Sequence, residues 1–324
     1  MRVLITGGAG FLGQLLARRI LAAGTLVVAG ADPAPVDELV LLDLVEPPGD
    51  LAADPRVRVR VGGLVDLMPA EADVDVVFHL AGVVSGAAEA DFDAGMAGNV
   101  DGTRAVLQRC RAQAVPPVLV FSSSVAVFGQ DPALPQVDEV GDETFPRPQT
   151  SYGTQKLIGE LLVADCTRKG FVRGRSVRLM TVSVRPGRPN AAASGFLSGI
   201  VREPLAGVRA VCPVPPDTPV ALSSPRRTIE GILTAAATDE ATWGSRAAVT
   251  LPGLTTTPRR MAEALDRVAG PGTSDLIDWR VDPAVAAMVA SWPARVRTDR
   301  AAALGLEPER SFDDIIRAYL EDLG

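Results

Sequence analysis

The chain has 324 residues, of which 47% are apolar and 4% aromatic, and it carries 39 acidic and 32 basic side chains. This length and composition allow one large or two ordinary domains with a buried core, and they exclude a disordered or fibrous protein. The net charge of -7 argues against a nucleic-acid partner, because binding to a phosphate backbone is driven by clustered cations.

The cysteine and histidine content bears on compartment and metal binding. Cys110, Cys166 and Cys212 are odd in number and widely spaced, which fits a reduced cytoplasm better than a disulfide framework. His79 is the only histidine, so a zinc or iron site is not expected. The first residues are strand-like and do not resemble a signal peptide, and no apolar run approaches the roughly 18 residues needed to span a bilayer. We therefore expect a cytoplasmic protein with no metal and no membrane span.

Apolar runs alternate with segments of helical period through the first half of the chain. In chain order, the expected strands are Arg2–Thr6, Leu39–Asp43, Val57–Val61, Val74–Leu80, Pro117–Ser122 and Ser176–Val184. The expected helices are Phe11–Ala23, Glu89–Gln113 and Ser151–Lys169, and residues Gly24–Glu38 form an expected inserted loop. This alternation predicts an α/β fold with a doubly wound parallel sheet of the Rossmann type, which binds ligands at the carboxyl ends of its strands.

The pattern changes beyond about Pro186, where proline and glycine become more frequent and the elements shorter. We expect a Rossmann domain over residues 1–185 and a smaller α/β substrate domain over 186–324, from which the chain returns to the first domain. The segment Ser311–Leu323 predicts a helix that Ser311 caps and that docks through one apolar face. The residues of that face are Ile315, Ile316, Tyr319 and Leu320.

A glycine-rich turn follows the first expected strand. Gly7, Gly10 and Gly13 come directly after Thr6 and open the first helix. Glycine is needed there because a Cβ would keep the backbone away from a pyrophosphate, which the helix N-terminus attracts. A glycine triplet alone also fits a flexible turn, but its place between a strand and a helix at the start of the chain favours dinucleotide binding.

Asp43 ends the second expected strand of the sheet, where an acidic residue binds the hydroxyls of the adenosine ribose. No arginine follows it to hold a 2′-phosphate, so NAD is favoured over NADP. The alternative is a strand-end carboxylate that is simply solvated.

Tyr152 and Lys156 stand four residues apart at the start of an expected helix, which places both side chains on one face. A phenol of pKa about 10 is a poor base at neutral pH, and a neighbouring ammonium stabilises its ionised form. The chain has only two tyrosines and two lysines, so this pair is hard to explain as an accident of a surface helix.

Five segments in chain order resemble the extended short-chain dehydrogenase/reductase superfamily. They are Gly7–Gly13, His79–Gly82, Asn99–Thr103, Ser122–Ser124 and Tyr152–Lys156. The resemblance implies that Ser124 holds the substrate oxygen and that Tyr152 exchanges its proton. It also implies that Lys156 binds the nicotinamide ribose and lowers the pKa of Tyr152, with Asn99 supporting the lysine, and that the protein is a homodimer through its long helices.

The glycine loop and the resemblance together imply a set of NAD contacts. They are Gly7, Gly10, Phe11, Leu12, Gly13, Asp43, Leu64, Leu80, Ala81, Gly82, Tyr152, Lys156 and Pro186. Strand alternation puts Ser122 and Ser124 on one face, and the family pattern favours Ser124. His79 is interpreted as a packing residue. Gly63 stands where the family usually has an aspartate for the adenine amino group, so adenine recognition must rest on the backbone near Leu64 or on another residue.

Further segments are similar to members of the superfamily that oxidise the C2 hydroxyl of a four-carbon sugar acid with NAD. They are Val83–Gly86, Glu89–Asp93, Thr150–Lys156, Arg185–Ser194, Arg202–Leu205, Cys212–Pro213 and Ser224–Arg227. A substrate carboxylate needs a cation, preferably a bidentate arginine. The expected substrate residues are Ser85, Ser124, Tyr152, Arg188, Asn190, Ser194 and Arg226, with Arg202 and Arg227 as further cations. Two alternatives stay open: a UDP-sugar 4-epimerase with retained NAD, and a non-catalytic NAD-sensing protein.

Overall fold

A seven-stranded parallel sheet forms the centre of the computed structural model, which describes residues 1–131, 133–187 and 193–322. Its strands in chain order are β1 (Arg2–Thr6), β4 (Glu38–Asp43), β5 (Val57–Val61), β6 (Val76–His79), β7 (Val118–Ser124), β8 (Arg173–Leu179) and β12 (Val249–Thr250). Their order in the sheet is β12-β8-β7-β6-β1-β4-β5, so the direction of winding changes between β1 and β6. This order confirms the Rossmann-type α/β prediction and puts the change of winding direction, where folds of this class bind ligands, at the carboxyl ends of β1 and β6.

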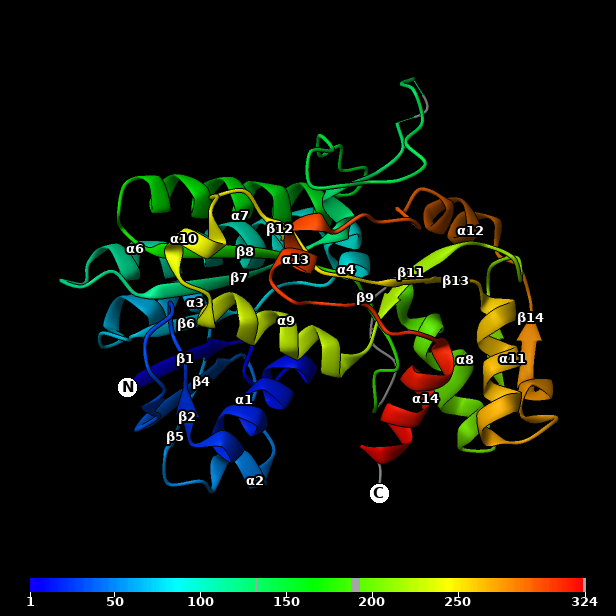
Figure 1. Ribbon diagram of the computed structural model, residues 1–324, viewed down its shortest axis with the longest axis horizontal. Coiled ribbons are helices and arrows are strands. Elements are labelled where there is room, and N and C mark those ends of the chain that lie inside the picture. Colours follow the sequence, from blue (N-terminus) through cyan, green and yellow to red (C-terminus); the bar gives the residue numbers. More distant parts are fainter. Residues whose placement is uncertain (132, 188–192, 323–324) are drawn as a thin grey trace.

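Helices cover both faces of this sheet (Figure 1). On one face lie α1 (Phe11–Ala23) and α9 (Pro225–Ala237), whose residues Leu16 and Ile232 are fully buried against strand residues such as Ile5. On the other face lie α6 (Gly102–Arg111) and α7 (Ser151–Arg168), which pack on alternate strand residues such as Leu4. Because helices cover both faces of the sheet and exclude water, most of its strands are nearly continuous runs of apolar residues. Such runs are easy to recognise, and most of these strands could therefore be predicted from the sequence.

The strand expected over Ser176–Val184 is wrong at both ends. The observed strand, β8, starts at Arg173 and ends at Leu179. It includes Arg175, a charged residue that is completely buried and that a pattern of apolar residues does not predict inside a strand. The Arg175 guanidinium is bonded to both carboxylate oxygens of Glu240, at 2.9 and 3.0 Å, and lies over the ring of Trp243. The chain then leaves the central sheet, and β9 (Thr181–Val182) pairs with β11 (Val220–Ser223) in a separate sheet.

The single long helix expected over Glu89–Gln113 is also wrong. The chain forms α4 (Ser85–Ala90), α5 (Phe92–Gly95), a π-helical segment over Met96–Asp101 and then α6. Asp91 has extended backbone angles and its carboxylate accepts from the amide of Ala94 at 2.9 Å, so it ends one helix and caps the next.

The inserted segment Gly24–Glu38 contains a small hairpin of β2 (Thr25–Leu26) and β3 (Ala34–Pro35). The amides of Ala29 and Gly30 donate to carbonyls at the end of α9. The insertion therefore satisfies a helix terminus while it lengthens the chain between Gly13 and Asp43.

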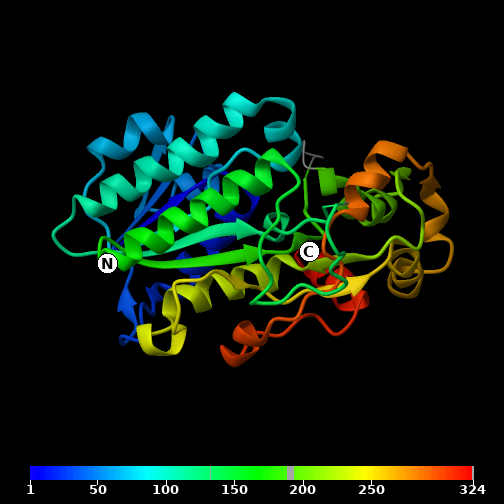
Figure 2. The same ribbon diagram turned by 90° about the horizontal axis from the view of Figure 1, so that it is seen from above.

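The remaining elements build a second core beside the sheet (Figure 2). They are α8 (Phe196–Leu205), β10 (Ala210–Cys212), β11, β13 (Leu254–Thr256), α11 (Pro258–Ala269), β14 (Ile277–Trp279), α12 (Pro283–Ala290) and α14 (Phe312–Glu321). Ser311 caps α14 as expected, but Leu320 is 38% exposed and Phe312 is buried instead. The segment α9, α10 (Glu240–Trp243) and β12 lies on the central sheet, whereas a domain boundary at residue 185 stays a prediction.

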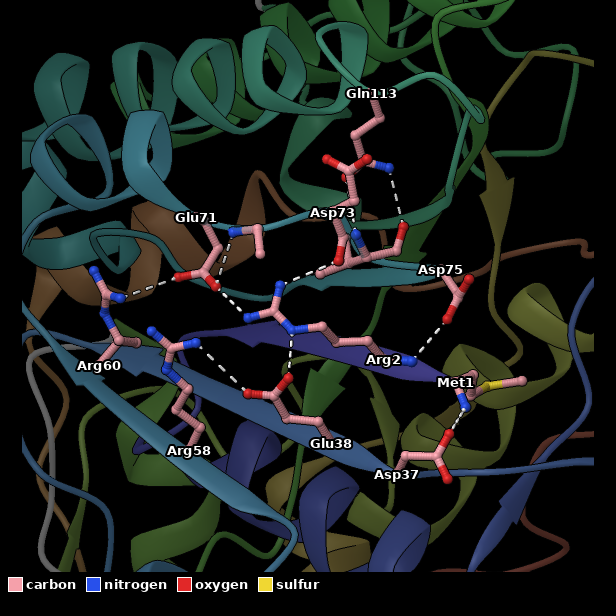
Figure 3. Close-up of polar contacts among 12 residues, drawn as sticks. Met1, Arg2, Asp37, Glu38, Arg58, Arg60, Glu71, Asp73, Asp75 and Gln113 are labelled. Atoms are coloured by element: carbon pink, nitrogen blue, oxygen red, sulfur yellow. Dashed lines mark hydrogen bonds and ion pairs between the residues drawn. The ribbon is translucent and has the colours of Figure 1, made fainter.

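An ionic network closes the amino end of the sheet (Figure 3). The Arg2 guanidinium bonds Glu38 at 2.6 Å and Glu71 at 2.5 Å, and the Glu71 side chain is 1% exposed. This network lies at the edge opposite the carboxyl ends of the strands, so we assign it to stability. Within the described part of the chain, no helix is long and apolar enough to cross a membrane.

Candidate active site

The glycine loop has the geometry of a phosphate cradle. Gly7 has a φ of +72°, and a Cβ added to it would lie 2.7 Å from the amide nitrogen of Ala81. A Cβ on Gly13 would lie 2.0 Å from the carbonyl oxygen of Gly7, so both positions require glycine. Helix α1 begins after Gly10 with no side-chain cap and no acidic residue in its first turn. Its N-terminal amides are therefore available to an anion such as a pyrophosphate.

Asp43 is tied directly to this loop. One carboxylate oxygen accepts from the amide of Ala9 at 2.9 Å, and the other accepts from the amide of Leu44 at 2.7 Å. A carboxylate has about four acceptor positions, so capacity remains for ribose hydroxyls. Asp43 thus lies where the sequence predicted an adenosine contact.

The other expected NAD contacts line the same edge of the sheet. The amides of Leu80 and Ala81 donate to the carbonyl and hydroxyl oxygens of Thr6, and Gly82 follows them. Leu64 starts the short helix α3 (Leu64–Leu67), and its side chain faces Gly102 of α6.

Two more of the expected contacts lie nearby in the chain. Phe11 and Leu12 form the first turn of α1 and are half-buried, whereas Pro186 is exposed just beyond β9. Asp66 was not predicted as an NAD contact. Its carboxylate lies beside Gly63, with one oxygen 3.1 Å from the position that a Cβ on Gly63 would take.

Tyr152 and Lys156 occupy the first turns of α7, as the spacing predicted. The hydroxyl of Thr150 caps this helix by accepting from the amide of Gly153 at 3.1 Å. A Cβ on Gly153 would lie 2.1 Å from the carbonyl oxygen of Ala126, so glycine lets α7 press against the end of β7. The Lys156 ammonium donates to the carbonyl oxygen of Ser122 at 2.9 Å and lies 5.6 Å from the centre of the Tyr152 ring.

The three consecutive serines at the end of β7 have different partners. The hydroxyl of Ser122 donates to the carbonyl of His79 at 3.0 Å, and that of Ser123 donates to the Glu160 carboxylate at 2.5 Å. The oxygen of Ser124 accepts from the amide of Ala126 at 3.1 Å, and the Ser124 hydroxyl acts to lower the pKa of Tyr152. Ser124 is therefore the serine whose hydroxyl is placed to share a substrate oxygen with the phenol.

Burial determines the protonation of the pair in the free chain. It raises the pKa of Tyr152 to about 12, with the Ser124 hydroxyl and the Arg185 guanidinium acting in the opposite direction. It lowers the pKa of Lys156 to about 8. The net shift of the phenol pKa is upward because burial outweighs these two neighbours in the free chain, so the expected lowering of the tyrosine pKa by Lys156 stays a prediction.

Asn99 lies in the π-helical segment and organises the loop beside Lys156. Its amide group exchanges two hydrogen bonds with the backbone of Val83, at 2.8 and 3.1 Å, and donates to the side-chain oxygen of Gln155 at 2.7 Å. No direct contact joins Asn99 to Lys156 among the described interactions, so its expected support of the lysine is indirect. Gln155 was missed in the sequence; its only signal was a polar residue next to Lys156.

His79 bridges two threonines in the interior. Its ring nitrogens contact the hydroxyls of Thr6 at 2.7 Å and Thr103 at 3.0 Å. Burial and the Lys156 ammonium lower the pKa of His79 to about 3, so the ring is neutral at physiological pH. Both nitrogens are occupied, which favours the interpretation of His79 as a structural residue.

We expect the single histidine to make the fold sensitive to mild acid. The unfolded chain binds the proton near pH 6.5 and the folded chain only near pH 3, so this contribution to stability is lost as pH falls through that window. Between pH 6.5 and 5 the free energy of unfolding should drop by about 2 kcal/mol. Urea titrations of wild type and His79→Gln across this range test it, and parallel curves for the two proteins would contradict it.

The expected substrate residues are only partly brought together. Ser85 opens α4, two residues beyond the Val83 backbone that Asn99 holds. Ser194 accepts a hydrogen bond from the guanidinium of Arg185 at 3.3 Å. Arg188 and Asn190 lie outside the described residues. Arg185 was not proposed as a substrate residue from the sequence, although it begins the segment that drew attention to its neighbours.

The structure directs the other expected cations elsewhere. The Arg226 side chain is 59% exposed and pairs with Glu321 of α14 at 2.8 Å, so the structure does not support its expected substrate contact. Arg227 pairs with Glu230 on its own helix, and Arg202 pairs with Glu203. Of these ion pairs, the one between Arg226 and Glu321 joins residues 95 positions apart, and a count of arginines could not reveal it.

Comparison with known proteins confirms the class that this site indicates. Residues 3–216 match the NAD dependent epimerase/dehydratase family, and the chain belongs to that family. It is 51% identical to the D-erythronate dehydrogenase of Cupriavidus necator, over 100% of this chain and 99% of that protein. It is 40% identical to the D-erythronate dehydrogenase of Haemophilus influenzae, over 99% of each chain.

Solved structures show the same fold. The structure described as a nucleoside-diphosphate-sugar epimerase from Agrobacterium tumefaciens superposes with a TM-score of 0.91 and 39% identity, over 99% of this chain and 94% of that one. L-threonine 3-dehydrogenase from Trypanosoma brucei superposes with a TM-score of 0.85 at 22% identity, over 99% and 96% of the two chains, a likeness of fold alone. The NAD dependence expected from the glycine loop is thus confirmed at the level of the family.

Proposed function

We propose that the protein oxidises the C2 hydroxyl of D-erythronate to 2-oxo-erythronate with NAD. The observation that carries the proposal is the meeting of Ser124, Tyr152 and Lys156 beside the glycine cradle. The substrate is supported by similarity over the full length to two D-erythronate dehydrogenases.

Each residue has a role in moving one proton. Ser124 and Tyr152 hold the C2 hydroxyl oxygen, and Tyr152 as phenolate takes its proton when the C2–H bond breaks. NAD bound at the glycine cradle would supply the hydride acceptor for C2, so the overall products would be the 2-oxo acid, NADH and one proton. The Lys156 ammonium favours the phenolate electrostatically. Asn99 and Gln155 hold the Val83 loop against α7 and keep the lysine side chain confined.

NADH formation with a panel of four-carbon sugar acids tests the proposal. We expect rapid formation with D-erythronate and slower formation with its stereoisomers. Turnover of a different 2-hydroxy acid with none of D-erythronate would refute the substrate and retain the reaction class.

A second function is favoured by one comparison, the high structural similarity to a protein described as a nucleoside-diphosphate-sugar epimerase. An epimerase would use the same three residues and keep its NAD bound through the cycle. Purified protein that holds stoichiometric NAD and interconverts UDP-sugars without net NADH formation would establish this alternative and refute the dehydrogenase.

We also propose a homodimer and a cytoplasmic location. The outer face of α7 carries Leu161, whose side chain is 63% exposed, and such a surface fits a helix-to-helix interface with a second copy. All three cysteines are free, which suits a reducing compartment. Sedimentation velocity of the pure protein measures the dimer directly.

A further inference from the structure

Arg185 is a half-buried cation whose backbone is held firmly in place. Its amide donates to the hydroxyl of Ser198 at 3.1 Å, and its carbonyl oxygen accepts from the guanidinium of Arg202 at 2.8 Å. Both partners belong to α8, so the start of the Arg185 side chain is fixed by a helix of the second core. A guanidinium anchored in this way is ready to bind a ligand without much loss of conformational entropy.

The guanidinium has few partners in the part of the chain that the structure describes. Among the described residues its side chain has one hydrogen bond, to the Ser194 hydroxyl at 3.3 Å, and no carboxylate within ion-pair distance. Arg178, by contrast, is paired with Glu160 at 2.8 Å, and Arg300 donates to backbone carbonyls. Removing a guanidinium partly from water without pairing it with a carboxylate costs free energy, and a bound anion of a ligand would offset that cost.

Arg185 follows the carboxyl end of β8, whose last residue Leu179 pairs with Ser124 of β7, so it comes off the same edge of the sheet as the catalytic serine. The guanidinium lowers the pKa of the phenol, and the phenol raises that of the guanidinium. Burial and the neighbouring Arg202 lower the pKa of Arg185. In a 2-hydroxy acid the carboxylate is one bond from the carbon that is oxidised, so a carboxylate-binding cation must lie beside the catalytic phenol.

We propose that Arg185 binds the carboxylate of the substrate, with the Ser194 hydroxyl beside it, and so restricts the enzyme to 2-hydroxy acids. The inference rests on the proposed function, since it assigns the acid end of the substrate of that same site. With the carboxylate on Arg185 and the hydroxyl oxygen between Ser124 and Tyr152, C2 is the carbon presented for oxidation. Neutral sugars lack the carboxylate that would complete Arg185.

Arg185→Gln and Arg185→Lys test the assignment, with Arg260→Gln on the exposed face of α11 as the matched control. We expect kcat/KM for D-erythronate to fall about 10²-fold in Arg185→Gln, mainly through KM, and less in Arg185→Lys. The preference for D-erythronate over its neutral carboxamide should shrink by a similar factor. The dissociation constant of NAD should stay unchanged, which also shows that the variant is folded.

Calorimetric binding of D-erythronate to the NADH-loaded protein supplies a readout that needs no turnover. We expect binding about 10²-fold weaker in Arg185→Gln than in wild type. Equal binding in the two proteins, or no binding to wild type, overturns the inference. Wild type that binds the acid through Arg185 yet forms no NADH with NAD refutes the proposed function alone, so the two failures are distinguishable.

Discussion

Replacing Tyr152 with phenylalanine should lower kcat/KM for sugar-acid oxidation by about 10²–10⁴-fold, the usual contribution of a general acid or base. The substitution removes one oxygen, and the ring keeps its contact with the Lys156 ammonium 5.6 Å from the ring centre. The pocket shape and the glycine cradle are unaffected, so NAD should bind as in wild type. Steady-state kinetics and the quenching of intrinsic fluorescence by NAD measure the two properties separately.

The chain offers a matched control for this experiment, because Tyr319 is its only other tyrosine. Tyr319 lies in α14 and is buried in the second core among apolar residues. Tyr319→Phe should leave kcat/KM within about twofold of wild type. Full activity of Tyr152→Phe would remove the proton-transfer role assigned to Tyr152.

Replacing Lys156 with methionine should lower kcat/KM by about 10²-fold at pH 7. A cation about 6 Å from the phenolate contributes about 3 kcal/mol at an effective dielectric constant of about 20. Methionine fills a similar volume in this buried position, where lysine is 4% exposed, so the fold should persist. The matched control is Lys169→Met, since Lys169 is the only other lysine and is exposed at the end of α7.

The pH profile gives this prediction its sharpest form. The pKa of Tyr152 is about 12 and that of Lys156 about 8, so below pH 8 the lysine is charged and the phenolate fraction rises tenfold per pH unit. Above pH 8 the loss of the ammonium offsets that rise, and the logarithm of kcat/KM should become flat. Lys156→Met should continue to rise through pH 8. A break at the same pH in the variant would show that another group titrates there.

Local sequence patterns were sufficient to predict those features that lie within a single helix, strand or turn. The strand over Arg2–Thr6, the helix over Phe11–Ala23 and the glycines between them were predicted with their observed bounds, because each is a short, continuous pattern of apolar residues and glycine. The spacing of Tyr152 and Lys156 depends only on the helical period, so it too was readable in advance. Asp43 followed from its place at the end of a strand.

Long-range packing decided the features that local patterns missed. Arg175 interrupts an apolar run, and only its pairing with Glu240, 65 residues away, lets it lie inside β8. The helix expected over Glu89–Gln113 breaks at Asp91, and the π-helical segment that follows turns Asn99 toward Val83 and Gln155.

For this protein the sequence by itself determined the class of fold, the dinucleotide loop and the identity of the tyrosine and lysine. Only the tertiary structure gave the three serines their separate partners, directed Arg226 to the C-terminal helix and left Arg185, among the described residues, without a carboxylate partner. The physical reason is that the function of a charged or hydroxyl side chain depends on the groups that surround it. Its partners come from other elements, and whether they satisfy it or leave it for a ligand depends on how those elements pack.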